Sequence, residues 1–198
     1  KHDATIYIDD AHGEGVLGKN GRGLASHFNL EGKVDIEVGT FSKAFGNMGG
    51  YVSGNKDLAE YIYNKARTFL LSASIPPATL ASCIAALEVI DEEPQIIQNL
   101  WSNVKYFKNG LNEMGFDIGK SVTPITPIML NDSNMAQRFS EELMRGGILA
   151  LPIIYPLVAR DKARIRTIIS AVHTMEDLDF ALESFEKVGK KLGVIHNK

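Results

Sequence analysis

Three short segments of the sequence hold side chains that could do chemistry. Asp9, Asp10 and His12 stand in "IDDAHGEG", Lys43 stands in "GTFSKAFGNMGG", and Arg166 stands in "ARIRTIISAVHT". Each segment alone has an ordinary interpretation, because an aspartate after a strand is often a cap and a loop lysine or strand arginine is usually solvated. Together, the first two segments would suit a cofactor that carries a basic ring nitrogen, an acidic hydroxyl, an aldehyde and a phosphate.

Two predicted strands would carry these two segments to one place. Residues 4–8 form an apolar run of β-branched and aromatic side chains, which is typical of a strand covered on both faces in a parallel sheet. The segment "VDIEVGTF" predicts a second strand, which ends near Thr40 and Lys43. Because open α/β sheets keep their ligands at the carboxyl ends of parallel strands, we expect these two residues to share a rim with Asp9 and His12.

The rest of the chain predicts further helices and strands. A strand is expected in "GGYVSG", followed by a helix that begins after Asn55 as its N-cap. Two more helices are expected to end near Asp91 and at Gly115. The C-terminal part then predicts the strand "PITPIML", the helix "NMAQRFSEELMRGG", the strands "ILALPIIYP" and "ARIRTIIS", and a helix over residues 175–192 that Thr174 and Asp177 begin.

This order of elements predicts two domains. Residues 1–93 are expected to be the C-terminal portion of a larger domain with a parallel or mixed sheet, and residues 94–198 a small α+β domain of ordinary size. The chain opens almost directly with a predicted strand, an unusual start for a complete protein. We therefore expect an N-terminal half that precedes this sequence.

Composition and charge disfavour several classes of function. The formal net charge is −3 and the Lys and Arg residues are scattered, so no basic surface for nucleic acid is expected. No apolar segment is long enough to cross a bilayer, and no membrane partner is expected. Cys83 is the single cysteine, which excludes an intrachain disulfide and fits a reducing cytosol, so a cytoplasmic location is predicted.

The motifs together resemble the α-oxoamine synthase family of fold-type-I pyridoxal-phosphate enzymes, and most closely its glycine C-acetyltransferase branch. The resemblance runs from "YIDDAHGEGVLGKNGRG" through "GTFSKAFG" and "ARIRTIISAVHT" to the closing "GKKLGVI". It implies an α/β fold, in which residues 1–93 belong to the large cofactor-binding domain and residues 94–198 form the small C-terminal domain. It also implies pyridoxal 5′-phosphate as the cofactor.

The resemblance implies roles for residues of the first two segments. Lys43 would hold the cofactor as a Schiff base and then remove the α-proton of the substrate, since an amine beside a cationic ring has a lowered pKa. Asp9 would keep the ring nitrogen protonated, so that the ring acts as an electron sink. His12 would bond the ring hydroxyl and Thr40 the phosphate. The remaining cofactor-binding residues by this resemblance would be Asp10, Ala11, Phe41 and Ser42.

The segment "LLSASIPP" is a second candidate phosphate site. Ser72 and Ser74 precede a helix led by proline, where backbone N–H groups favour an anion, although a simple N-cap explains the serines equally well. The resemblance implies that this segment, with the backbone of Ala73 and the side chain of Ser74, reaches the cofactor phosphate of a neighbouring subunit. A homodimer is therefore expected.

Arg166 is the expected substrate-binding residue. A planar guanidinium binds a carboxylate through two parallel hydrogen bonds, which lysine cannot do. Arg164 would share the same strand face, so geometry alone leaves both arginines open. The resemblance selects Arg166. His173 is interpreted as the end of that strand rather than as a catalytic group.

The favoured activity is the condensation of glycine with acetyl-CoA to 2-amino-3-oxobutyrate and CoA, or its reverse in threonine breakdown. The wording of "ARIRTIISAVHT" and "LGVI" favours this branch. The alternative within the family is 8-amino-7-oxononanoate synthase, which joins alanine to a longer acyl thioester. Outside the family, "DDAH" with Glu14 could be the metal site of a hydrolase, which would leave Lys43 and Arg166 unexplained. An inactive fragment is the third interpretation.

Overall fold

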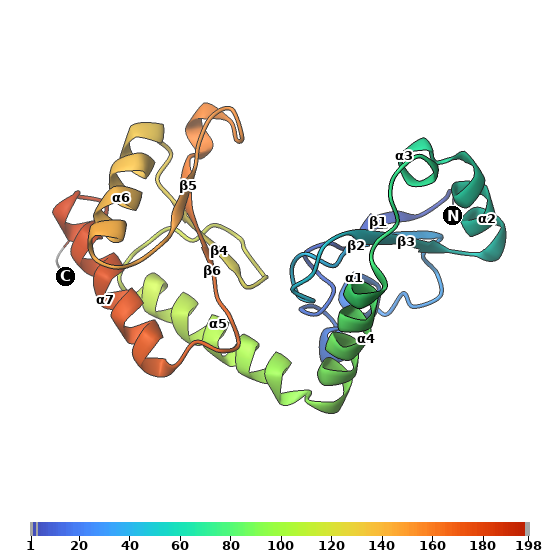
Figure 1. Ribbon diagram of the computed structural model, residues 1–198. Coiled ribbons are helices and arrows are strands. Elements are labelled where there is room, and N and C mark those ends of the chain that lie inside the picture. Colours follow the sequence, from blue (N-terminus) through green and yellow to red (C-terminus); the bar gives the residue numbers. More distant parts are fainter. Residues whose placement is uncertain (1, 3, 197–198) are drawn as a thin grey trace. The chain divides into compact units, whose positions relative to one another are not determined.

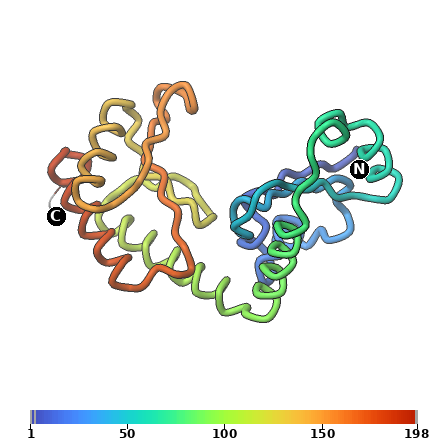
Figure 2. The backbone as a smooth tube through the Cα atoms, viewed as in Figure 1, coloured from blue at the N-terminus to red at the C-terminus, as the bar shows by residue number. Residues whose placement is uncertain are grey.

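The computed structural model describes residue 2 and residues 4–196. The chain divides into two units, residues 1–97 and residues 98–198, and each unit contains one three-stranded sheet. Figure 1 shows the elements of each unit, and Figure 2 traces the path of the backbone through them. The domain limits expected from the sequence, 1–93 and 94–198, stay a prediction.

The sheet of the first unit has the order β1-β2-β3, formed by Tyr7–Asp9, Ile36–Thr40 and Gly50–Gly54. Strand β1 runs parallel to β2, with Asp9 opposite Val38, so the expected parallel pairing is confirmed. Strand β3 runs antiparallel to β2 and places Gly50 opposite Thr40. The sheet is therefore mixed, and the chain returns to the Thr40 end of β2 through a short loop.

Strand β1 differs from its prediction in length and in burial. It covers three residues rather than residues 4–8. Tyr7 is 59% exposed and Ile6 is 43% exposed, so the prediction of a strand covered on both faces is wrong for this chain. The apolar pattern predicts a strand here, as found. The burial of a strand depends on the elements that pack against its two faces, and a local pattern does not encode those elements.

Helices follow the predicted order in the first unit. Asn55 caps α2 (Lys56–Lys65), because its Oδ1 accepts a hydrogen bond from the Leu58 N–H at 2.8 Å, as predicted. The predicted helix that ends near Asp91 is α4 (Pro77–Glu92). The short helices η1 (Lys19–Gly21), α1 (Gly23–His27) and α3 (Arg67–Leu70) were not predicted.

The second unit contains the strands and α-helices that the sequence predicted, together with the short helix η2, which was not predicted. Three antiparallel strands in the order β4-β6-β5 form its sheet. The elements in chain order are α5 (Gln95–Glu113), which begins at the end of the first unit, β4 (Ile125–Met129), α6 (Ser133–Arg145), β5 (Leu151–Ile153), η2 (Arg160–Lys162), β6 (Arg164–Ile168) and α7 (Met175–Lys191).

The core of the second unit lies between one face of this sheet and its helices (Figure 1). Phe107 of α5, Phe139 of α6 and Phe185 of α7 are each at most 1% exposed, and the Phe107 and Phe185 rings meet edge to face with centroids 5.9 Å apart. Ile165 of β6 is fully buried on the same side. Because side chains alternate along a strand, Arg164 and Arg166 lie on the opposite, open face.

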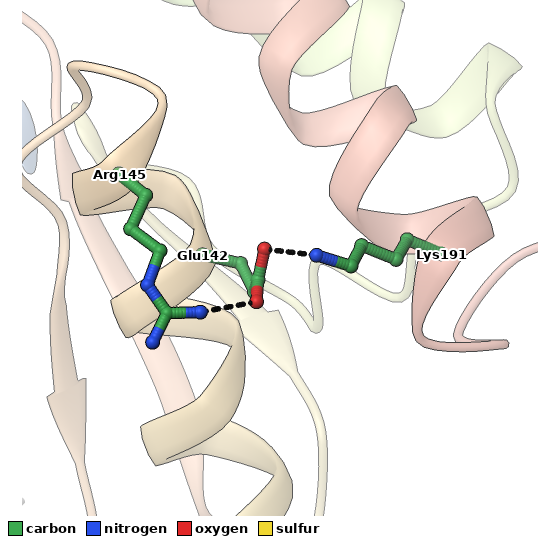
Figure 3. A network of polar contacts seen from close by, with 3 residues as sticks. All are labelled: Glu142, Arg145 and Lys191. Carbon is green, nitrogen blue, oxygen red and sulfur yellow. Dashed lines mark hydrogen bonds and ion pairs between the residues drawn. The ribbon is translucent and has the colours of Figure 1, made fainter.

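An ion-pair network joins α6 to α7 (Figure 3). The Glu142 carboxylate accepts hydrogen bonds from Arg145 at 2.7 Å and from Lys191 of α7. The hydrogen bond from Lys191 is the main reason that the pKa of Glu142 lies below its ordinary value. Among the helices of residues 2 and 4–196, none is both long and apolar enough to cross a membrane.

The start of α7 gives a prediction about stability and pH. Thr174 Oγ1 accepts from the Asp177 N–H at 3.2 Å, and the Asp177 carboxylate accepts from the Thr174 N–H at 2.9 Å, which confirms the expected cap. The Thr174→Ala variant is expected to lose about 1 kcal/mol in free energy of unfolding, measured by urea denaturation.

The same cap has a defined pH dependence. The hydrogen bond from the Thr174 N–H lowers the pKa of Asp177 below its ordinary value. A carboxylate with a lowered folded-state pKa stabilises the fold above its unfolded pKa, and this contribution is lost as the pH falls through the folded-state value. The difference in stability between the natural chain and Asp177→Asn should therefore shrink below roughly pH 4. Glu176→Gln, in the same turn, is the matched control, and an equal loss in both variants would contradict the prediction.

Candidate active site

The parallel pairing of β1 and β2 places the ends of both strands side by side. Asp9 is the last residue of β1 and Thr40 is the last residue of β2. The Asp9 Oδ1 accepts a hydrogen bond from the Ala11 N–H at 3.1 Å, which orients the carboxylate in the turn after β1. The side chain of Asp9 is exposed, and so is that of His12 in the same turn. A carboxylate and an imidazole are thus both exposed to solvent at this edge.

Asp10 points to a different place from Asp9. Its side chain is 2% exposed, and its Oδ2 accepts from the Leu24 N–H at 2.7 Å, at the start of α1. Burial is the main cause that raises the pKa of Asp10, and the nearby charge of Asp9 adds to it. The carboxylate of Asp10 thus anchors the helix that follows, and we leave its side chain out of the proposed ligand site.

Lys43 lies in a loop between β2 and β3 that its own backbone closes. The Phe41 N–H donates to the Gly49 carbonyl at 3.0 Å, and the Asn47 N–H donates to the Phe41 carbonyl at 2.7 Å. The Asn47 side chain donates to Ser82 Oγ of α4 at 3.0 Å, which ties the loop to a helix. Gly49 has φ of 98°, a conformation that favours glycine. The Lys43 amine is exposed on a fixed loop.

Two hydroxyl groups lie between β2 and Lys43. Thr40 Oγ1 and Ser42 Oγ are 2.8 Å apart, and the Ser42 N–H donates to Thr40 Oγ1 at 3.2 Å. Thr40 Oγ1 also donates to the Gly49 carbonyl at 3.1 Å. Hydroxyl and backbone N–H groups of this kind can bind phosphate oxygens. They lie at the end of β2, the strand on which Val38 is the partner of Asp9.

Glu14 holds this edge together, a role that sequence reasoning missed. Its side chain is 7% exposed. One carboxylate oxygen accepts from the Thr40 N–H at 2.5 Å, and the other accepts from the Tyr51 hydroxyl at 2.7 Å. Burial, followed by the hydrogen bond to Glu14, raises the pKa of Tyr51 above its ordinary value. A Cβ atom at Gly39 would lie 2.2 Å from this carboxylate. The glycine within the predicted strand was therefore the signal that another group approaches the backbone closely at this point.

The candidate phosphate segment lies next to the Lys43 loop of its own chain. Ser72, Ala73 and Ser74 are exposed. A Cβ atom at Gly49 would lie 2.7 Å from the Ile75 side chain, which places residue 75 against the loop. Neither serine caps α4, since the N-cap is Pro76 and Ser72 Oγ donates to the Thr68 carbonyl. Ser72 is thus bonded within its own segment, while Ser74 is exposed next to residue 75.

Arg166 belongs to the second unit. It is exposed on the open face of β6, where its cross-strand neighbours are Pro127 of β4 and Leu151 of β5. Asp9, Thr40 and Lys43 thus belong to the first unit, at the ends of β1 and β2 and in the loop after β2, whereas Arg166 lies on the sheet of the second unit.

The carboxylates of "DDAH" and Glu14 make hydrogen bonds to the protein backbone. Asp10 binds the Leu24 N–H and Glu14 binds the Thr40 N–H. Within the part of the chain that the structure describes, no group of three or more His, Cys, Asp and Glu side chains is arranged to hold a metal ion.

Comparisons with known proteins point to one family. The class I and II aminotransferase family matches residues 1–185. The 8-amino-7-oxononanoate synthase of Thermosipho melanesiensis is 56% identical over 195 residues, which are 98% of this chain and 50% of that protein. The chain thus spans about half the length of the curated relatives that it matches.

Two solved structures extend the comparison to the fold. A structure of SPT with PLP has a TM-score of 0.93 and 32% identity, and the match covers 98% of this chain and 49% of that one. The 8-amino-7-oxononanoate synthase of Francisella tularensis has a TM-score of 0.82 and 29% identity, and the match covers 93% of this chain and 55% of that one.

Proposed function

Because the chain belongs to the class I and II aminotransferase family, we propose that it supplies the lysine-bearing half of a pyridoxal-phosphate enzyme that joins an amino acid to an acyl thioester. Its fold is the predicted one, the α/β fold-type-I fold of pyridoxal-phosphate-dependent transferases. The observation that supports the proposal is the parallel pairing of β1 with β2, because Asp9 at the end of β1 lies opposite Val38, on the strand that leads through Thr40 into the Lys43 loop.

The residues at this edge fit pyridoxal phosphate. A carboxylate, two hydroxyls and an exposed amine stand within one sheet edge and its loop, and they match the ring nitrogen, phosphate and aldehyde of the cofactor. The closely packed backbone of Gly39 and Gly49 fixes the loop on which the amine stands. When bound, pyridoxal phosphate supplies an electron sink that stabilises negative charge on the α-carbon of the amino acid.

The chain's own residues have defined tasks in this proposal. Asp9 keeps a proton on the ring nitrogen, and His12 bonds the ring hydroxyl. Thr40 and Ser42 would bind the phosphate through their hydroxyl groups, in exchange for the hydrogen bonds that these hydroxyls now make to each other and to the Gly49 carbonyl. Lys43 Nζ would hold the cofactor and, once the amine of the amino acid has displaced it and left it free, would take the proton from the α-carbon of the amino acid. Arg166 binds the carboxylate of the amino acid through its guanidinium.

The names of the relatives favour a different substrate pair from the one expected from the sequence. The relatives at 50–56% identity carry the name 8-amino-7-oxononanoate synthase, which was the alternative. In that product, carbons 8 and 9 with their amine are alanine without its carboxylate, and carbons 1 to 7 are a dicarboxylic acyl group. We therefore replace glycine and acetyl-CoA by alanine and pimeloyl-CoA, with CoA and carbon dioxide as the other products.

A homodimer is part of the proposal. Ser74 is exposed and stands next to residue 75, which packs against the Lys43 loop. In a dimer, the Ser74 hydroxyl and the Ala73 backbone would add hydrogen bonds to the phosphate held by the neighbouring subunit.

The substrate pair is tested with the holoenzyme. Glycine and alanine are each combined with acetyl-CoA, heptanoyl-CoA and pimeloyl-CoA, and the release of CoA is followed together with the ketone product by mass spectrometry. We expect alanine with pimeloyl-CoA to give a kcat/KM at least about tenfold above every other pair, since a missing charged contact costs about that much. Preference for glycine with acetyl-CoA would restore the acetyltransferase and contradict this proposal.

A further inference from the structure

A groove on the open face of the second sheet has an unusual lining. Its volume is about 780 Å³. Its apolar side is formed by Ile125, Pro127 and Met129 of β4 with Ile153 of β5. Strand β6 contributes Arg164 and Arg166, which stand between these two strands in the sheet. The groove thus combines a hydrocarbon surface with guanidinium groups.

The charge of the lining is strongly positive. Lys120, Lys162, Arg164 and Arg166 face one carboxylate among the described lining residues, that of Asp117. The Asp117 Oδ1 already accepts from the Gly119 N–H at 2.9 Å. Lys162 forms a long ion pair outside the groove, with its Nζ 3.8 Å from the Asp161 carboxylate. The net charge of the lining therefore favours an anionic ligand.

The two arginines can bind two separate anions. Residues two apart on a strand point to the same face, with Cα atoms about 6.6 Å apart at about 3.3 Å per residue. Met129 and Ile153 flank Arg164, while Pro127 and Leu151 flank Arg166. The Arg164 Nε donates to the Lys162 carbonyl at 3.0 Å, which orients the guanidinium and leaves its Nη atoms to meet a ligand.

The half-buried side chain of Lys108 holds one wall of the groove in shape. Lys108 Nζ donates to the Ser121 carbonyl at 2.8 Å and to the Thr123 carbonyl at 2.7 Å. Burial lowers the pKa of Lys108. Ser121 and Thr123 both line the groove, so its wall is fixed by the protein rather than by a ligand.

We propose that Arg164, with Lys162 beside it, binds the distal carboxylate of a dicarboxylic acyl donor whose methylene chain lies on the apolar side of the groove. The inference rests on the proposed function, in which Arg166 already binds the carboxylate of the amino acid. A seven-carbon dicarboxylic acyl group has the two parts that the groove offers, an apolar chain and a terminal anion. Arg164 is then the residue that selects for acyl donors with a charged end.

The phosphates of CoA are a second source of negative charge. A phosphate group carries no methylene chain of its own that could cover the apolar side of the groove, whereas the acyl carboxylate ends such a chain. The acyl carboxylate therefore fits the groove better. The two sources separate in experiment, because heptanoyl-CoA keeps the phosphates and lacks the carboxylate, while the pimeloyl thioester of pantetheine keeps the carboxylate and lacks the phosphates.

The test measures KM in the holoenzyme for the Arg164→Gln variant with these three donors. We expect the KM for pimeloyl-CoA and for pimeloyl-pantetheine to rise at least about tenfold, with the KM for heptanoyl-CoA changed less than about twofold. The KM for alanine should stay unchanged. Arg138→Gln removes an exposed arginine of α6 outside the groove and is the matched control.

A rise for both CoA thioesters but not for pimeloyl-pantetheine would assign Arg164 to the CoA phosphates and overturn the inference. An equal rise for all donors, or none, would also overturn it. Calorimetry measures the binding of pimelate and of heptanoate to the holoenzyme without turnover, so it tests binding in the groove separately from the reaction. If the natural holoenzyme binds pimelate through Arg164 but turns over no pimeloyl thioester, the proposed function is wrong, while the binding of a dicarboxylate in the groove is supported.

Discussion

The Lys43→Ala variant is expected to lose at least about a thousandfold in turnover, because a positioned base contributes about 10²–10⁴ and the same amine attaches the cofactor. Absorbance near roughly 420 nm, where lysine imines of this cofactor absorb, should disappear from the purified protein. Lys43 is exposed on a loop closed by backbone hydrogen bonds, so the fold should not change. Turnover, absorbance and circular dichroism are measured together.

The control for this variant is Lys65→Ala, which removes an exposed lysine at the end of α2. It should keep both turnover and absorbance. Lys43→Arg keeps the positive charge but lacks an amine that forms an imine, and it should behave like Lys43→Ala. If either substitution at position 43 kept the absorbance, the attachment would belong to another residue and the proposed site would be wrong.

The Glu14→Ala variant should show the largest loss of stability among the variants considered. Glu14 is buried and accepts from the Thr40 N–H and the Tyr51 hydroxyl, so its removal leaves two donors without their acceptor. A hydrogen bond to a charged group contributes about 1.5–3 kcal/mol, so a loss of about 3 kcal/mol in free energy of unfolding is expected. Urea denaturation measures it.

The same variant should also weaken cofactor binding, because Thr40 leads into the Lys43 loop. Glu14→Gln keeps one carbonyl acceptor and should lose less stability than Glu14→Ala. Tyr51→Phe removes only the hydroxyl contact and leaves the Thr40 contact in place, so it should retain more cofactor than Glu14→Ala. Equal denaturation midpoints for the natural chain and Glu14→Ala would show that these contacts do not fix the loop.

Local features of this protein could be predicted from its sequence. The Asn55 and Thr174 caps follow from side chains that bond their own helix, and the periodic apolar residues of α5 mark its length. The parallel pairing of β1 and β2 followed from two apolar runs that end in polar residues. The caps and the helix periodicity involve residues close together in the chain, so the sequence encodes them directly, and the pairing follows from the rule that ligand-site residues gather at the carboxyl ends of parallel strands.

Features that join distant segments were not predicted. The contact of Glu14 with Tyr51 requires β3 to return antiparallel beside β2, and no local pattern shows this return. The different environments of Asp9 and Asp10 depend on α1, a short helix without strong sequence signals. The sequence did not decide the acyl donor either, and the names of the relatives favour the alternative over the first preference, since the motifs around Lys43 and Arg166 concern the cofactor and the amino acid.

The opposite environments of Asp9 and Asp10 restrict changes in chain length at this point. Asp9 is fixed opposite Val38, and Asp10 is fixed to Leu24. An extra or missing residue directly after Asp9 would break either the pairing of Asp9 opposite Val38 or the hydrogen bond of Asp10 to the Leu24 N–H. Evolutionary tolerance for such changes should therefore concentrate in the exposed connection over residues 29–33.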